Sequence, residues 1–272
     1  MSKPTPKNLE QAEEIEINLP CRYNDKLEKI VERANYDDEL KALWRMQNIN
    51  AVDRKGFSDH GPVHMQIVSN IALKIGRLLF KDGKQPSLVE NFTGFEKEDA
   101  EVVLAVAGML HDVGMSVHRN HHEKNSVIIA KDVVDRLLEE VYTTTERTIL
   151  RSEILHAILC HRSDSDPLTL EAGIVRVADA LDMEKGRSKI TFENGRVDIH
   201  SVSAAAVENV DIRPGEDVPV SIKVYLNNSA GIFQITGLLR KKLDGSGIED
   251  FIEVEAEVDL ENGEEVVEQI SL

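Results

Sequence analysis

The strongest constraint on this fold is a change in the spacing of apolar residues near residue 188. Before that point, apolar side chains recur every three or four residues, which is the period of amphipathic helices. After it, segments such as 218–226 alternate apolar and polar residues with a period of two, which is typical of strands. The pattern predicts a mainly α chain, helical over most of its length and ending in a small α+β unit.

Local start and stop signals give the boundaries of these elements. Gly61-Pro62 places a proline in the first turn of one helix, and Asp82-Gly83 ends that helix. The predicted helices cover 24–54 (two helices), 61–82, 98–113, 122–141, 145–161, 168–185 and 228–247, and the predicted strands cover 190–197, 218–226 and 251–258. We therefore divide the chain into N-terminal helices (1–56), a helical domain (57–188) and a small α+β domain (189–272).

The charge and the ends of the chain exclude several classes of protein. With 49 acidic against 32 basic residues, the net charge is -17, which repels the phosphate backbone of long nucleic acids. Residues 1–14 are polar, and no run approaches the ~18 apolar residues of a membrane helix. We expect a cytoplasmic protein that binds neither long nucleic acid nor a membrane.

Several histidines and aspartates lie where the helical pattern points inward. His161 shares a helix face with Ile154 and Ile158, whereas His156 lies about 140° away at 100° per residue. Asp179 sits in an apolar stretch, where a carboxylate is costly unless it is paired or binds a metal. Further donors are His64 and His122, which each lead an apolar stripe, and His111-Asp112 at a helix end. Together these side chains form a nitrogen and oxygen ligand set that suits iron, manganese, nickel, zinc or magnesium at a bundle centre.

The order His64, His111-Asp112, His161 and Asp179 resembles the H…HD…H…D signature of the HD superfamily of metal-dependent phosphohydrolases, over about residues 58–188. The resemblance implies an all-helical HD-domain bundle. It also implies that His64, His111, Asp112 and Asp179 bind one divalent ion, that Asp112 bridges to a second ion, and that His122 and His161 complete a dinuclear centre. His118 and His121 compete with His122 for its role. His60 could replace His64, but it precedes the helical proline.

The resemblance further implies hydrolysis of a phosphomonoester or phosphodiester of a small compound, such as a nucleotide, by metal-activated water. The predicted catalytic residues are Asp112 and, as proton donors to the leaving group, His118 or Lys124. Asp182 is placed to orient a ligand. The cations expected to bind the substrate phosphate are Arg119, Lys124, Arg162 and Arg187.

Two other functions remain open. The same ligands with two irons would suit a diiron oxygenase, and a structural metal would suit a non-catalytic binding or assembly module. In the α+β domain, residues 227–239 resemble the strand-to-helix turn of small ACT-type regulatory domains, with packing or dimerisation as the alternative role. We expect a homo-oligomer, such as a dimer.

Overall fold

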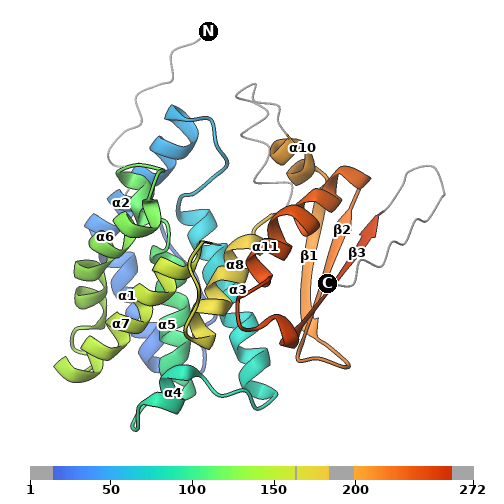
Figure 1. Ribbon diagram of the computed structural model, residues 1–272. Coiled ribbons are helices and arrows are strands. Elements are labelled where there is room, and N and C mark those ends of the chain that lie inside the picture. Colours follow the sequence, from blue (N-terminus) through green and yellow to red (C-terminus); the bar gives the residue numbers. More distant parts are fainter. Residues whose placement is uncertain (1–14, 163, 184–198, 259–272) are drawn as a thin grey trace.

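The computed structural model describes residues 15–162, 164–183 and 199–258. A bundle of helices and a three-stranded sheet lie side by side, with α11 between the sheet and α8 (Figure 1). The helices are α1 (Asp25–Tyr36), α2 (Asp38–Asn48), α3 (Pro62–Lys81), α4 (Ser87–Asn91), α5 (Lys97–Leu110), α6 (His122–Leu138), α7 (Thr144–Cys160), α8 (Leu170–Leu181), α10 (Ile199–Ala205) and α11 (Arg240–Leu243). The predicted fold class is confirmed.

Side chains at the helix ends explain where several of these helices begin. The side chain of Asn24 accepts a hydrogen bond from the backbone amide of Leu27 at the start of α1. Thr143 and Glu146 form a reciprocal capping box at the start of α7. Pro62 occupies the first turn of α3, as predicted. The short helix α4 lies between the predicted helices at 61–82 and 98–113 and was not itself predicted.

Helix α5 forms the centre of the bundle and packs against α3, α7 and α8. Nearly all of its residues from Asp99 to Leu110 are buried. Gly108 allows α3 to approach closely, since an added Cβ would lie 2.6 Å from Oγ of Ser69. Trp44 of α2 donates a hydrogen bond to the carbonyl oxygen of Met109 at 2.9 Å. The last turn of α5, and the His-Asp pair that follows it, are therefore fixed in the core.

The sheet is formed by β1 (Val207–Pro214), β2 (Val220–Leu226) and β3 (Ile252–Val258), in that order. β1 and β2 are antiparallel, whereas β2 and β3 are parallel and are joined through the π-helical segment Gln234–Leu239 and α11. The predicted strands at 218–226 and 251–258 correspond to β2 and β3. The sequence pattern missed α10 and β1, and the predicted strand at 190–197 lies outside the described residues.

The boundaries between the three predicted domains, at residues 56 and 188, stay predictions. Across the three described stretches, no helix is both long enough and apolar enough to pass through a bilayer.

Candidate metal centre

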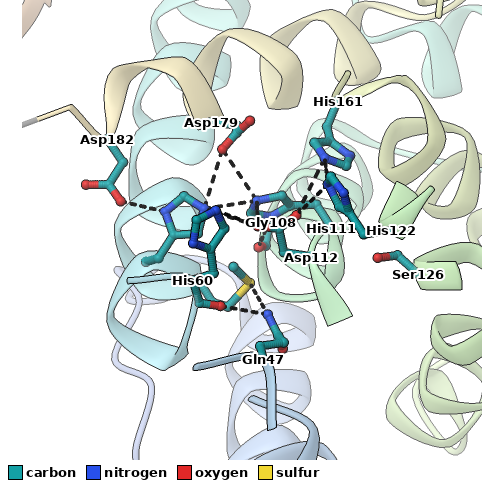
Figure 2. Close-up of polar contacts among 12 residues, drawn as sticks. Gln47, His60, Gly108, His111, Asp112, His122, Ser126, His161, Asp179 and Asp182 are labelled. Carbon is teal, nitrogen blue, oxygen red and sulfur yellow. Dashed lines mark hydrogen bonds and ion pairs between the residues drawn. The ribbon is translucent and has the colours of Figure 1, made fainter. Parts of the chain in front are cut away.

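Two groups of three side chains, each able to hold a metal ion, lie next to one another in the helical core (Figure 2). The first group, called cluster 1, is His64, His111 and Asp179. The second, called cluster 2, is Asp112, His122 and His161. Within each cluster the donor atoms lie within 4.8 Å of one another. All six residues predicted as ligands are brought together, five of them buried and Asp179 partly buried.

Each of the six candidate ligands comes from a helix or from the first two residues beyond its end. His64 lies in the first turn of α3, His122 is the first residue of α6, and Asp179 lies in the last turn of α8. His111 and His161 each follow the last residue of α5 and α7. The helices themselves are held by apolar packing, so the ligands are positioned by a rigid core.

Gly114, in the 3-10 segment Val113–Ser116 that follows α5, packs directly against the start of α6. The backbone amide of Gly114 donates a hydrogen bond to Oγ of Ser126 at 2.8 Å. A Cβ at Gly114 would lie only 2.1 Å from the carbonyl oxygen of His122. This close approach requires glycine, and it places His122 next to Asp112.

The four histidines of the two clusters share one orientation, with Nδ1 bound to an outer oxygen and Nε2 turned towards the centre. Nδ1 of His111, His122 and His161 lies 2.9, 2.8 and 2.6 Å from the carbonyl oxygens of Gly108, Arg119 and Ile158, respectively. Nδ1 of His64 lies 2.5 Å from Oδ2 of Asp182. A carbonyl oxygen can only accept a hydrogen bond, so Nδ1 carries the proton and Nε2 keeps its lone pair in each neutral ring.

The facing Nε2 atoms fit a metal ion. They lie 3.2 Å apart between His64 and His111, and 3.1 Å apart between His122 and His161. Two lone pairs at that distance repel each other unless a cation lies beside them. Nitrogen ligands about 2.1 Å from an ion are about 3.0 Å apart at a right angle and about 3.4 Å apart in a tetrahedron, so both distances suit shared coordination. The donor set and its spacing therefore fit the divalent ions expected from the sequence.

Asp112 lies between the two clusters and presents one oxygen to each. Its Oδ2 lies 3.7 Å from Nε2 of His111 and 3.8 Å from Nε2 of His64. Its Oδ1 lies 3.0 Å from Nε2 of His122 and 3.6 Å from Nε2 of His161. A carboxylate that bridges two ions needs this arrangement.

Burial alone would raise the pKa of Asp112, but the nearby His111 and His122 hold it well below the ordinary value. Burial likewise opposes ionisation of Asp179, yet Lys242 and the histidines of cluster 1 keep its pKa well below the usual range. Burial lowers the pKa of His161 well below its ordinary value. These groups are thus in the ionisation states that metal ligands require, carboxylate and neutral imidazole.

His122 differs from His161 in its ionisation. Burial favours its neutral form, but the charge of Asp112 and a hydrogen bond to it outweigh that effect and raise the pKa of His122. A proton on His122 would therefore compete with a metal ion bound by cluster 2.

A small pocket of about 330 Å³ opens beside cluster 2. Its lining includes His122, His121 and two of the predicted phosphate-binding residues, Arg119 and Arg162. Arg119 is exposed and stacks over the ring of Phe57, 4.3 Å from its centroid. A larger pocket of about 840 Å³ borders His64 and Asp182 on the side of α3 and β1.

The other predicted residues lie farther out. His118 and Lys124 are exposed, and neither lines the small pocket or belongs to a cluster in the described part of the chain. The Nδ1 atom of His118 accepts a hydrogen bond from the backbone amide of Asn120 at 2.9 Å. His121 is exposed and adopts a left-handed backbone conformation. Arg187 lies outside the described residues.

Three further residues contact the ligands. His60, considered in place of His64, is partly buried, with Nε2 4.0 Å from Oδ2 of Asp112. Asp182 contacts His64, the orienting role that the sequence suggested, although it lies just beyond the end of α8 and not within that helix. Lys242 was missed: Nζ lies 2.8 Å from Oδ2 of Asp179. No local motif marks it, because it lies 63 residues along the chain from Asp179.

The HD domain family model matches residues 63–184. Over 242 residues the chain is 41% identical to the uncharacterized protein MJ1020 of Methanocaldococcus jannaschii, and the match covers 87% of this chain and 92% of that protein. More distant relatives are Ribonuclease Y of Symbiobacterium thermophilum, 24% identical, and Ribonuclease Y of Thermoanaerobacter pseudethanolicus, 22% identical. Each of these two matches covers 80% of this chain but only 41% and 42% of the relative, respectively. No solved structure matches the chain.

Proposed function

The chain belongs to the HD-domain family of metal-dependent phosphohydrolases, and on that premise we propose that it hydrolyses a phosphomonoester or phosphodiester of a small compound, such as a nucleotide, at a dinuclear centre. The observation that carries the proposal is the pair of clusters sharing Asp112, with one carboxylate oxygen facing each pair of Nε2 atoms. A centre of this kind supplies activation of a water molecule and neutralisation of charge on the phosphoryl group.

The residues of this chain supply binding and orientation. Outer hydrogen bonds fix the four histidine rings, so their Nε2 atoms need no reorganisation to act as ligands. In the small pocket, Arg119 and Arg162 offer guanidinium groups for phosphate oxygens beside cluster 2. The Nε of Arg162 makes no hydrogen bond within the described residues, and its ion pair with Oδ1 of Asp164 is long, at 3.9 Å, so the guanidinium keeps hydrogen-bonding capacity for a phosphate. The proton for the leaving group is proposed to come from His118 or Lys124.

A small substrate is favoured over a polymer by the net charge of -17 and by the size of the pocket. The distant relatives are named Ribonuclease Y, which favours a second candidate, cleavage of RNA phosphodiesters. An RNA oligonucleotide therefore belongs in the substrate panel.

The test is a hydrolysis screen of the purified protein loaded in turn with Mn²⁺, Ni²⁺, Mg²⁺ or Fe²⁺, against phosphomonoesters, phosphodiesters, nucleotides and RNA. We expect turnover of a small phosphate compound, and loss of at least 100-fold in His111→Ala and Asp112→Ala, in keeping with the several kcal/mol that metal chemistry supplies. Asp132→Asn, at an exposed position, is the control.

The alternatives give different results in the same experiment. Oxygen consumption by the iron-loaded protein without hydrolysis would indicate the diiron oxygenase. A tightly bound metal with no turnover of any substrate would indicate a binding or assembly module.

A further inference from the structure

The C-terminal unit is docked on the face of α8 that carries a cluster 1 ligand. Gly173, Arg176 and Asp179 lie at successive intervals of three residues on α8, and each contacts the segment 240–248. A Cβ at Gly173 would lie 2.2 Å from the carbonyl oxygen of Ser246, so the two backbones meet there.

Arg176 fixes the position of α11 along α8. This arginine is only 3% exposed, and its guanidinium donates hydrogen bonds to the carbonyl oxygens of Lys241 and Asp244 at 3.2 and 3.1 Å. These carbonyls lie in α11 and just beyond its end. The buried guanidinium of Arg176 therefore donates to carbonyl oxygens that have no donor within the short helix. The register of α11 on α8 is therefore fixed one turn away from Asp179.

Lys242 lies between those two anchored carbonyls and points at the metal centre. Its Nζ lies 2.8 Å from Oδ2 of Asp179 and also donates to the carbonyl oxygen of His161, which follows α7. The side chain is 17% exposed. One ammonium group thus contacts a ligand residue of cluster 1 and the backbone of a ligand residue of cluster 2.

The two oxygens of Asp179 have separate partners. Oδ2 is held by Lys242, whereas Oδ1 lies 3.4 Å from Nε2 of His64 and 3.6 Å from Nε2 of His111. A carboxylate held at one oxygen already points its second oxygen towards the other ligands before an ion binds. Its side chain then loses less conformational entropy when the ion binds.

We propose that Lys242 is a positioning residue of the metal centre that holds Asp179 in the orientation needed for coordination. The C-terminal unit thereby contributes a residue to this centre. The proposal rests on the metal centre put forward above. It assigns the C-terminal unit a role in metal binding, in addition to any role in ligand binding or dimerisation.

The direction in which metal affinity changes when Lys242 is replaced distinguishes a positioning role from an effect of its charge alone. At a pH high enough to keep Asp179 ionised without Lys242, the ammonium of Lys242 only repels a divalent cation, so a lysine that acts only through its charge weakens metal binding, and its removal would tighten it. A positioning lysine has the opposite effect, because its removal frees the carboxylate.

The experiment measures Mn²⁺ affinity of the full chain by titration calorimetry after chelator treatment. Lys242→Met keeps the length of the side chain without its charge, and Lys242→Arg keeps a cationic donor. We expect Lys242→Met to weaken Mn²⁺ binding by about 10-fold to 100-fold, the usual effect of losing an outer partner of a ligand, and Lys242→Arg to recover part of it. Lys241→Met, at the exposed neighbouring lysine, should stay within about twofold of the parent protein.

A double-mutant cycle with Asp179→Asn keeps the proposal testable if Lys242→Met also affects folding. If Lys242 acts through Asp179, its replacement adds little once Asp179 is changed. Unchanged or tighter Mn²⁺ binding in Lys242→Met, or full additivity in the cycle, would overturn the role of Lys242 alone. Absence of Mn²⁺ binding by the parent protein would overturn the metal centre itself and this role with it.

Discussion

The Oδ2 atom of Asp182 lies 2.5 Å from Nδ1 of His64, so a carboxylate from the end of α8 sets the orientation of a ligand on α3. Both side chains are buried. The contact fixes the proton on Nδ1 and directs the lone pair of Nε2 towards His111. Asp182 therefore supports cluster 1 through His64 without belonging to either cluster.

Replacing Asp182 should weaken metal binding without removing a ligand. We expect Asp182→Ala to weaken Mn²⁺ binding by about 10-fold to 100-fold, because His64 loses its orienting partner, and Asp182→Asn to retain part of the affinity through its amide oxygen. Calorimetric titration of Mn²⁺ into the metal-free variants measures this loss. The exposed Asp132→Asn is the control, and equal affinities for Asp182→Ala and the parent protein would contradict the role.

The number of metal ions bound per chain should distinguish Asp112, which faces both clusters, from His161, which belongs to cluster 2 alone. We expect elemental analysis of the loaded protein to give about two ions per chain, about one in His161→Ala and fewer than one in Asp112→Ala, since Asp112 contacts both clusters. Equal loss of metal from Asp112→Ala and His161→Ala would contradict a position of Asp112 between two ions.

The candidate ligands could be chosen from sequence because each interrupts, leads or follows an apolar helical stripe. His161 was preferred over His156 by its helical face. In the structure His161 lies in cluster 2, whereas His156 accepts a hydrogen bond from the backbone amide of Leu168. Such local signals indicate which side of a helix is buried. The resemblance to a family then assigns the inward-facing residues to a metal site.

Contacts between distant segments had no such signal. Lys242 lies in a basic stretch that is typical of an exposed helix end. Only the packing of α11 against α8 brings it to Asp179. The strand β1 was also missed: Val210 and Ile212 alternate with polar residues, but this alternation is short, and the pairing with β2 supplies the stabilising contacts. Tertiary context, and not local propensity, determines such elements.

Metal affinity should fall as the pH falls, beginning above the ordinary histidine value of 6.5. The pKa of His122 is raised by Asp112, so in the metal-free protein this ring takes up a proton at a higher pH than usual, and a metal ion must displace that proton. Above the raised pKa no proton is displaced and the affinity levels off, whereas below it Mn²⁺ affinity should drop about tenfold per pH unit. Titrations in buffers of different ionisation enthalpy measure the released proton. An affinity that is constant down to pH 6 would contradict this coupling.

The turn after the His-Asp pair should tolerate no side chain. Gly114→Ala would place a Cβ 2.1 Å from the carbonyl oxygen of His122, which must then move away from Asp112. We expect a loss of about 1–3 kcal/mol in the free energy of unfolding, the usual cost of overpacking, measured by denaturant titration of the metal-free protein. Ile128→Ala, on the exposed face of α6, should change the free energy of unfolding by less than about 0.5 kcal/mol. Equal stabilities for the two variants would show that the turn can relax.

The pocket beside cluster 2 should affect substrate binding more than metal binding. Arg162 lines this pocket, and its buried Nε makes no hydrogen bond within the described residues. Loss of a charge-assisted hydrogen bond of about 1.5–3 kcal/mol corresponds to a rise in KM of about 10-fold to 150-fold, so we expect Arg162→Gln to raise KM in that range with Mn²⁺ content unchanged. Arg151→Gln, whose side chain pairs with Asp135 away from the centre, is the matched control. If Arg162→Gln instead lost metal with KM unchanged, the guanidinium would be supporting the ligands of cluster 2 and would not be binding the phosphate.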